Sequence, residues 1–584
     1  MSGYWKATDK IPIKQTSVRI PSENNLDHIA GQEIRIRIDE NLKFFNPAAT
    51  FLECDVLIKP PAYSSASGAT LTKPTRLQLD AETGFQSLIR SLRIHDSNGV
   101  LLEEIDNYNT LVSVKYDYHS NDSIRGRRAL TEGCGAYDVA SRGGQGTTKS
   151  ILSNHKTNSY YKPVSSTSPL SASWAPGDFV PAKVCVPLHS GIMSNDQIFP
   201  NMLMGGITIT LLLEDNRYCF RQLESVMRFR KLNLNPKFDG ITSVGGNLSA
   251  STAQIFCAET NAQWLNVSQC PFVVGERISM ERYHDSADVT VNWTWASYPE
   301  ITSIAYDTNK IRLNFNASYP VGTTVVVGED WYIYSSSVAS STSYDATYVV
   351  KNVNLIVQEI DAGPQYEAEM MRKMKEGGVI NYDFLTFTTY KYSQLQTDRV
   401  ANIRIPIENS RAKSILCVPL DSTPYTTKQI LNASETYEIE PEDKVENPTN
   451  FRLCSNRPNL EGIVDGITNY QFLYNGRLQP SRQVDLTKLA TKKSISGQHL
   501  IELDKGLSQA GITGHSLAKH RNNFVIARAL ALGNATYDAR GRDFSLQVNY
   551  QNVDEPPEKP KLWVMLCAHI RRIQIRNDSV SLVI

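Results

Sequence analysis

Alternation of apolar and polar residues with a period of two is the feature that most constrains the fold of this 584-residue chain. Such alternation puts every second side chain on one face of a strand, which is typical of sheets with one buried face. It recurs from one end of the sequence to the other, at 34–38, 207–213, 353–357, 403–407 and 544–550. The chain is therefore predicted to be all-β.

Turn residues, rather than regular helices, separate these predicted strands. Clusters of Gly, Pro, Asn and Ser between strands favour antiparallel sandwiches over alternating strands and helices around a parallel sheet. Only three segments have a helical pattern, at 84–92, 106–118 and 366–375, and the last of them ends before Gly377 and Gly378. The predicted fold is thus an antiparallel sandwich architecture with few short helices.

The length of the chain predicts two large domains, because single hydrophobic cores stop growing beyond roughly 250–300 residues. Each half ends with a strand, a turn-rich loop and a strongly alternating strand, the first half near 184–214 and the second near 524–575. We predict a first sandwich over residues 1–225, a β-rich insertion or connecting tower over 226–345, and a second sandwich over 346–584.

Composition and charge exclude several classes of protein. Hydrophobic residues make up 41% and charged residues 21%, values typical of globular proteins and not of disordered tails or coiled coils. Sixty basic and sixty acidic residues cancel, and no long block of one sign is present. Binding of nucleic acid by general electrostatic attraction is therefore not expected, and no specific nucleic-acid sequence is predicted as a partner.

The sequence predicts neither export nor a transmembrane segment. The first ten residues lack the apolar core of a signal peptide, and no stretch approaches the roughly 20 apolar residues that cross a bilayer. Nine cysteines are scattered and never spaced as CxxC. Structural thiols made in a reducing compartment, rather than disulfides or metal ligands, are the expectation.

Motifs for nucleotide, metal and hydrolase chemistry are incomplete. The stretch 143–150 nearly matches a phosphate-binding loop, but Thr148 occupies the place of the second glycine. His515 and His520 are five residues apart, which puts them on different faces of a helix, unlike a zinc pair. The stretch 514–518 resembles a nucleophile elbow without its strand-to-helix context. We predict no catalytic, cofactor-binding or metal-binding residue, and no enzyme activity.

A carbohydrate-binding or glycan-processing protein with several sandwiches remains the alternative. Carboxylate pairs such as Glu103 with Glu104, or Glu281 with Asp285, could serve glycoside hydrolysis, and the aromatic stretches 293–295 and 331–334 could stack on sugars. Sixty acidic residues produce such pairs by composition alone, and buried aromatic residues are commoner than sugar platforms. A viral spike or fibre would need a repetitive shaft, which the sequence lacks.

Several motifs resemble one family when they are taken in order. The sequence PLHSGIM at 187–193, with FPNML at 199–203 and GGITI at 205–209, resembles the end of the first jelly roll in major capsid proteins of virophages and polinton-like viruses. Two further pieces upstream, at 84–94 and 103–109, and two downstream, at 271–275 and 350–357, follow in a compatible order. The chain is identified by this order and spacing as similar to the double jelly-roll family.

This resemblance implies a major capsid protein with two tandem jelly rolls, located in the virion capsid of an icosahedral double-stranded DNA virus. It further implies a homotrimeric capsomer of hexagonal outline, whose partners are neighbouring capsomers, penton proteins and minor capsid proteins. No cofactor is implied.

Two placements within such a capsomer follow as expectations. We expect the region 226–345 and the small-polar stretches 64–72, 164–173 and 335–343 to form an outward tower. The segment around Lys6, Lys10 and Lys14 is either an inner-face arm or a disordered terminus.

Overall fold

The computed structural model describes most of the chain, in many segments. These are residues 14–24, 27–59, 62–64, 70–72, 76–79, 83–119, 122–134, 182–219, 221–229, 238–239, 254–258, 278–283, 301–307, 310–315, 330–335, 347–422, 449–455, 460–486, 497–512, 523–550, 560–576 and 579–583. Lys6, Lys10 and the stretch 164–173 lie outside them, whereas Lys14 begins the first strand.

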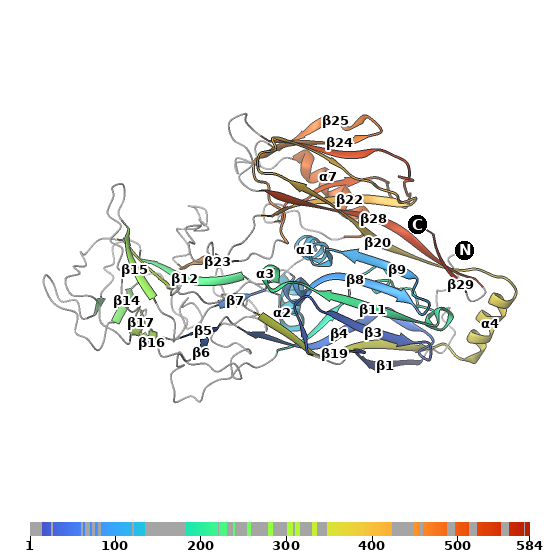
Figure 1. Cartoon of the computed structure of the whole chain (residues 1–584), viewed down its shortest axis with the longest axis horizontal. Helices are drawn as coiled ribbons and strands as arrows, with labels where there is room; N and C mark the ends of the chain where they lie inside the picture. The colour runs from blue at the N-terminus through green and yellow to red at the C-terminus, as the bar shows by residue number, and fades with distance from the viewer. Residues whose placement is uncertain are drawn as a thin grey trace.

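Two antiparallel sandwiches make up the body of the molecule (Figure 1). In the first sandwich, one sheet has the order β1 (Lys14–Pro21), β19 (Thr347–Asp361), β4 (Phe45–Lys59) and β10 (Ala182–Pro187), with the short β2 (His28–Ile29) also on β19. The facing sheet has the order β3 (Glu33–Asp39), β11 (Gly206–Leu213), β8 (Ile89–Asp96) and β9 (Leu101–Asp106).

The second sandwich is built in the same way. One sheet has the order β20 (Ile380–Gln394), β28 (Lys561–Arg576), β22 (Ala412–Asp421) and β26 (Ile526–Ala529), with β29 (Ser579–Val583) also on β28. The facing sheet has the order β21 (Val400–Arg404), β27 (Phe544–Tyr550), β24 (Ile467–Tyr474) and β25 (Arg477–Asp485). The prediction of an all-β fold with two sandwiches is confirmed.

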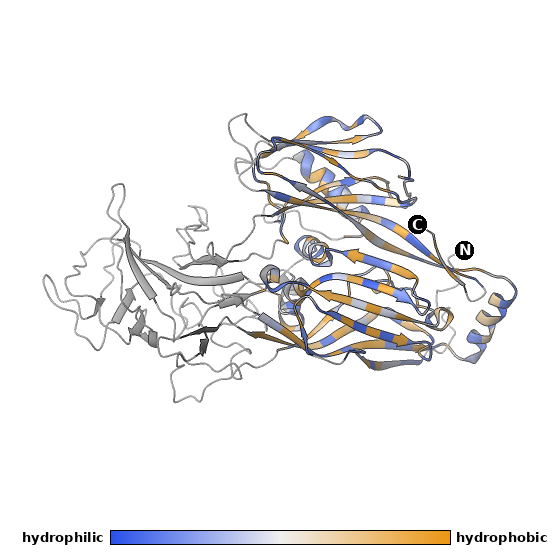
Figure 2. Ribbon diagram, in the orientation of Figure 1, coloured by the Kyte–Doolittle hydropathy of each residue, from blue (hydrophilic) through white to orange (hydrophobic). Residues whose placement is uncertain are grey.

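Alternation in the sequence sets the register of these sheets. Ile36 and Ile38 of β3 are fully buried, and the ladder pairs them with Ile209 and Ile207 of β11, so that four isoleucines share one layer of the core. Figure 2 shows the same alternation of hydrophobic and hydrophilic residues along the strands of both sandwiches. A shift of register by one residue would turn these isoleucines to solvent.

Strand β19 corrects the predicted domain boundary. We had assigned residues from 346 onwards to the second sandwich, but β19 lies between β1 and β4 in the first sandwich. Its pairing partners are thus more than 280 positions away in the sequence, beyond the whole 226–345 region. The first sandwich therefore continues to Asp361, and the second begins after α4 (Pro364–Lys375).

Smaller sheets lie beyond one end of the first sandwich, on the side away from α4 (Figure 1). One contains β15 (Ile278–Tyr283), β18 (Asp330–Ser335), β12 (Arg221–Phe229), β23 (Thr449–Ser455) and β7 (Arg76–Gln78). The others are formed by β13 (Phe238–Asp239), β14 (Gln254–Ala258), β17 (Lys310–Phe315) and β16 (Ile301–Asp307), and by the hairpin of β5 (Ala62–Ser64) and β6 (Thr70–Thr72). Strands from the connections of both sandwiches therefore lie at this end of the molecule.

Two of the three predicted helices are present, as α1 (Tyr108–Tyr118) and α4. The prediction over 84–92 is wrong beyond Leu88: a 3-10 helix, η1 (Gly84–Leu88), is followed directly by β8, whose Leu92 pairs with Leu211 of β11. A second 3-10 helix, η3 (Asn201–Met204), and the helices α2 (Asp122–Thr131), α3 (Asn216–Cys219) and α7 (Gly497–Gln509) were not predicted. In the described residues, no helix is long and apolar enough to span a membrane.

The position of β19 generates a stability prediction. Leu355 is fully buried in the first sandwich, so Leu355→Ala should lower the free energy of unfolding by about 2–5 kcal/mol through lost burial and a cavity. Glu359→Ala, a half-buried position on the same strand, should change it by less than about 0.5 kcal/mol. Urea unfolding followed by tryptophan fluorescence measures both, and equal effects would contradict this role of β19.

Candidate functional site

A buried polar site is built at the junction where the first sandwich meets the second. Strand β9 and helix α1 of the first sandwich lie beside β20 of the second (Figure 1). The hydrophobic core of the first sandwich continues through this junction, because Tyr382, Phe384 and Phe387 of β20 belong to the same buried cluster. The two sandwiches are therefore packed on each other rather than joined by a linker alone.

Glu103 of β9 is the central polar residue of this junction and is fully buried. Its Oε1 accepts hydrogen bonds from the backbone N–H of Gly191 (2.6 Å) and from the hydroxyl of Thr386 (2.5 Å). Its Oε2 accepts a hydrogen bond from the N–H of Ile192 (3.1 Å). One carboxylate thus connects β9, the loop after β10 and β20, and these donors offset the cost of burying a charge.

Two basic side chains complement this buried carboxylate. Arg571 of β28 donates a hydrogen bond from its guanidinium to the carbonyl of Leu102 (2.9 Å), and burial lowers the pKa of Arg571 while Glu103 and Glu104 act to raise it. Burial also lowers the pKa of Lys115 on α1 to about 8, against the opposing effect of Glu103. The Lys115 ammonium lies 5.1 Å from the ring centroid of Phe387 in the second sandwich.

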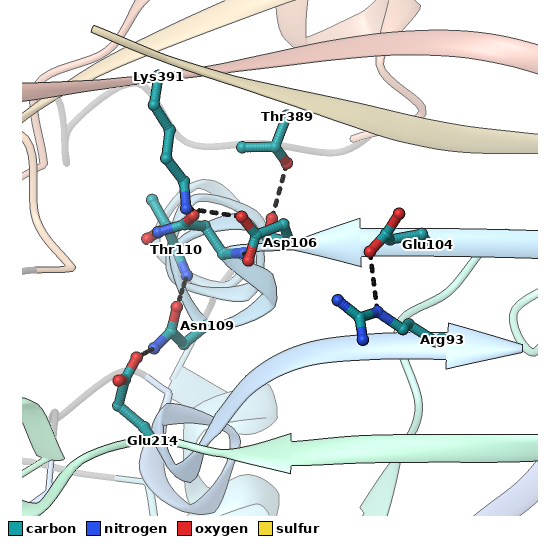
Figure 3. Close-up of polar contacts among 9 residues, drawn as sticks. Arg93, Glu104, Asp106, Asn109, Thr110, Glu214, Thr389 and Lys391 are labelled. Atoms are coloured by element: carbon teal, nitrogen blue, oxygen red, sulfur yellow. Dashed lines mark hydrogen bonds and ion pairs between the residues drawn. The ribbon is translucent and has the colours of Figure 1, made fainter. Parts of the chain in front are cut away.

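A more exposed polar contact closes the edge of the junction at the start of α1 (Figure 3). The Lys391 ammonium lies 2.6 Å from Oδ2 of Asp106, and the Thr389 hydroxyl donates to the carbonyl of Asp106 at 2.7 Å. Both charged side chains are about 40% exposed, so solvent screens this ion pair. The Asp106–Lys391 ion pair therefore orients the edge of the junction between β9 and β20 and adds little to the stability of the fold.

Asn523 ties helix α1 to the second sandwich from a fully buried position. Its side-chain amide donates to Oδ2 of Asp117 (2.6 Å) and to the hydroxyl of Ser113 (3.2 Å). Its backbone carbonyl accepts a hydrogen bond from the hydroxyl of Tyr118 (2.7 Å), and its side-chain oxygen accepts one from the N–H of Gly462 (2.8 Å). All the polar atoms named here have partners, which is what a buried polar connection requires.

Gly191 lets the backbones of the two sandwiches approach each other. A Cβ atom at this position would lie 2.2 Å from the carbonyl oxygen of Leu385 and 2.7 Å from a ring carbon of Phe384. The same loop donates a hydrogen bond from Asn195 to the carbonyl of Asp383 (2.9 Å). Only glycine fits where two backbones are this close.

A second buried network connects α1, the end of α2 and the loop after β10. The Tyr116 hydroxyl lies 2.6 Å from both Oε2 of Glu132 and Nε2 of His189, and the Arg128 guanidinium stacks 3.5 Å from the Tyr116 ring centroid. Burial lowers the pKa of His189 and raises the pKa of Glu132. The His189 ring therefore stays neutral at physiological pH, and the backbone N–H of His189 donates a hydrogen bond to the hydroxyl of Tyr108 (2.8 Å).

The chemistry considered from the sequence receives no support from the geometry of the described residues. Glu103 and Glu104 face opposite ways along β9, and Glu104 pairs with Arg93 at 2.8 Å (Figure 3), so the two do not flank a common cleft. Across the described part of the chain, no group of three His, Cys, Asp or Glu side chains converges on a metal position. The other candidates have no described side chain: 143–150, 514–518, Asp285, 293–295, His515 and His520 lie outside the described residues, and only the backbone is described at Glu281 and 331–334.

Both sandwiches have the same strand order, and this order decides the fold. Counted along each sandwich, the first, eighth, third and sixth strands form one sheet, and the second, seventh, fourth and fifth form the other. That order in two facing sheets is the jelly roll. The chain is a double jelly roll. Its fifth and sixth strands are joined through helices in both halves, α1 and α2 in the first and α7 in the second.

Comparisons with known proteins give matches in structure only. No family model matches the sequence, and no curated protein is similar to it. The double jelly roll is similar to the faustovirus major capsid protein, with a TM-score of 0.48 and 9% identity over 97% of this chain and 92% of that one. It is also similar to PBCV-1 VP54 fitted into a reconstruction of the virophage Sputnik, with a TM-score of 0.46 and 9% identity over 99% of this chain and 98% of that one. A third similar structure is the mavirus major capsid protein, with a TM-score of 0.38 and 10% identity over 97% of this chain and 90% of that one.

Sequence reasoning did not find the residues of the junction. Glu103 was considered only as half of a carboxylate pair, and neither Gly191 nor Asn523 was singled out. One signal was present, since Glu103 occupies an inward position of a strand in Leu102–Ile105, where a charged residue needs buried partners. The identity of those partners, in β20 and in the loop after β10, has no local signature.

Substitution of Gly191 tests the close approach of the two sandwiches. Gly191→Ala should lower the free energy of unfolding by about 1–3 kcal/mol or more, because the added methyl group overlaps the backbone of Leu385. Gly497→Ala is the matched control: nothing lies within 4 Å of a Cβ there, and the change should be neutral or slightly stabilising. Thermal unfolding by calorimetry measures both, and an unaffected Gly191→Ala protein would contradict the packing described.

Buried histidines predict a loss of stability in acid. Burial lowers the pKa of His569 in β28 to about 4 and that of His189 well below its usual value. Below about pH 6.5 the unfolded chain binds protons that the folded chain does not, so stability present at neutral pH is lost as the pH falls toward 4. His569 alone should contribute a loss on the order of 2 kcal/mol between pH 7 and 5.

The measurement is the free energy of unfolding by urea at several pH values. His569→Gln should reduce the slope between pH 7 and 5, because it removes the buried imidazole whose pKa is lowered. A slope that is the same in the parent and the His569 variant would show that this histidine is not the buried neutral group described.

Proposed function

We propose that this chain is the major capsid protein of an icosahedral double-stranded DNA virus and acts as a structural shell subunit, not as an enzyme. The observation that supports this most directly is the fixed pair of jelly rolls with identical strand order. Three chains carrying such pairs supply six similar units around one axis. Their outline is hexagonal, and hexagonal blocks tile a shell with few kinds of contact.

The junction supports a rigid structural role for the two sandwiches. It buries Glu103 and Asn523 with their hydrogen bonds satisfied, and it continues the core of the first sandwich onto β20. An interface of that kind resists relative motion of the two sandwiches, unlike the polar interfaces of domains that move. A wall element needs this rigidity, whereas a catalytic cleft between domains commonly needs the opposite.

The arrangement of the insertions gives the subunit two unlike ends. Strands from the connections of both sandwiches collect at one end, and α4 lies at the other (Figure 1). In a shell, the end with the added sheets faces outward as a tower and the end with α4 faces inward. The sequence resemblance over residues 84–357 supports the function as a capsid protein. Partners of the subunit are other copies in the trimer, neighbouring capsomers, and penton and minor capsid proteins.

The mass of the protein in solution tests this function. Light scattering coupled to size exclusion should give three times the chain mass of 65.3 kDa, and negative-stain microscopy of that peak should show hexagonal outlines. A monodisperse particle of 65.3 kDa would overturn the capsomer and favour the carbohydrate-binding alternative. A glycan array with the same sample distinguishes that alternative, since a shell subunit should retain no glycan specifically.

A further inference from the structure

One lysine of the second sandwich is buried without any exposed surface. It is Lys561, the first residue of β28, and lysine is almost never fully buried unless it is paired. Its ammonium forms an ion pair with Oδ2 of Asp465, whose side chain is only 8% exposed. The same ammonium lies 4.9 Å from the ring centroid of Tyr550. A primary amine and a carboxyl group are therefore held in contact away from water.

A second buried carboxylate lies beside this pair. Asp421, the last residue of β22, stands directly opposite Lys561 in the ladder and is 4% exposed. On the other side of β28, the ladder pairs Lys561 with Gln394 of β20, which is 2% exposed. Side chains that are directly opposite in an antiparallel ladder share one face of the sheet. The lysine therefore has a carboxylate on one side and an amide on the other, in addition to its contact with Asp465.

Gln394 fixes the aromatic wall of this site. Its Oε1 accepts hydrogen bonds from Nε1 of Trp563 (2.7 Å) and from the hydroxyl of Tyr550 (2.9 Å). Both rings belong to the buried core of the second sandwich. Gln394 thus holds the Tyr550 ring near the ammonium, and the surroundings of the ion pair are largely apolar. In such surroundings two opposite charges are costly to keep, and conversion to neutral groups removes that cost.

A tight turn holds the carboxyl group of Asp465. The N–H of Ile467 donates a hydrogen bond to the carbonyl of Val464 (3.1 Å), so Asp465 and Gly466 are the central residues of the turn. Both have positive φ, 37° and 78°, as a type I′ turn requires. The turn continues directly into β24, which begins at Ile467. Its position is therefore set by the sheet, and the carboxyl group is held against the amine.

We propose that Lys561 and Asp465 condense to form an isopeptide bond between β28 and the turn that precedes β24. A proton first passes from the ammonium to the Asp465 carboxylate, which leaves a neutral amine beside a neutral carboxylic acid. The Nζ lone pair then forms a bond to Cγ, and Asp421 takes one proton from the nitrogen and returns it to the departing hydroxyl. The Cγ–Oδ bond breaks and one water leaves, so no oxidant, reductant or further reactant is needed. Fixed positioning of the two groups gives the rate advantage of an intramolecular reaction.

The bond joins the two facing sheets of the second sandwich, because β28 and β24 belong to different sheets (Figure 1). It closes a ring between residues that are 96 positions apart. A cross-link over such a distance restricts the unfolded chain and thereby stabilises the folded one. The inference goes beyond the proposed capsomer and does not depend on it, since the bond forms within a single chain.

Burial, rather than proximity, distinguishes this pair from the ion pairs at the surface. Lys391 and Asp106 approach each other to 2.6 Å, but their side chains are 37% and 41% exposed. Water keeps both members of an exposed pair charged and screens their attraction. The Lys391–Asp106 pair should therefore remain an ordinary ion pair, and it serves as the comparison for Lys561–Asp465.

Mass spectrometry of the purified full chain tests the bond. The parent mass should be lower than the sequence mass by one water, about 18 Da. After digestion with trypsin, the peptide that contains Lys561 should be joined to the peptide that contains Asp465, and cleavage after Lys561 should be absent. The peptides of Lys391 and Asp106 should stay separate.

Three variants identify the groups that react, and circular dichroism shows whether each is folded. Lys561→Arg keeps a buried cation next to Asp465 but has no primary amine, so it should have the full sequence mass. Lys391→Arg is the matched control at the exposed pair and should keep the loss of water. Asp421→Asn removes the group that carries the proton and should lower the linked fraction at least tenfold.

The parent chain decides the question without the variants. A parent with its full sequence mass and separate peptides would overturn the proposal, so the test does not depend on the folding of any variant. A loss of about 17 Da, which is ammonia from Gln394 instead of water from Asp465, would also overturn it. A loss of water that persists in Lys561→Arg would contradict the assigned amine, and an unchanged linked fraction in Asp421→Asn would contradict the role of Asp421.

Discussion

The burial of Glu103 between two sandwiches is the interaction on which the architecture depends. A carboxylate with no exposure must receive hydrogen bonds, which come from the backbone N–H groups of Gly191 and Ile192 and from the hydroxyl of Thr386. The charges of Lys115 and Arg571 act on it at longer range. Separating the sandwiches would remove the Thr386 hydroxyl and the Arg571 charge at once. The relative position of the two sandwiches is therefore determined as specifically as the positions of side chains in a packed core.

Repetition of one fold within a chain does not give two equivalent halves. Both sandwiches have the same strand order and both carry helices between their fifth and sixth strands, yet α1 is enclosed and α7 is not. The difference arises because a linear pair has one internal contact and two free ends.

Much of the fold followed from local pattern. The strands around Ile36, Ile209 and Leu546 were predicted because their side chains alternate with the period of a half-buried strand. The helices α1 and α4 were predicted from helical patterns at 106–118 and 366–375, the second of which ends before Gly377. The pattern failed over 89–92, where pairing of β8 with β11 overrides a helical spacing. It also missed α7, although four of its thirteen residues are buried.

The sequence by itself determined which face of each alternating strand is buried, because alternation and turn residues are properties of neighbours along the chain. It did not determine which strands are neighbours in space. The assignment of β19 to the first sandwich, the enclosure of Glu103 and the close approach at Gly191 were decided by the tertiary structure alone. Their partners lie between 88 positions (Glu103 to Gly191) and 347 positions (Lys14 to Asp361) away, and the free energy that selects them comes from burying whole faces together.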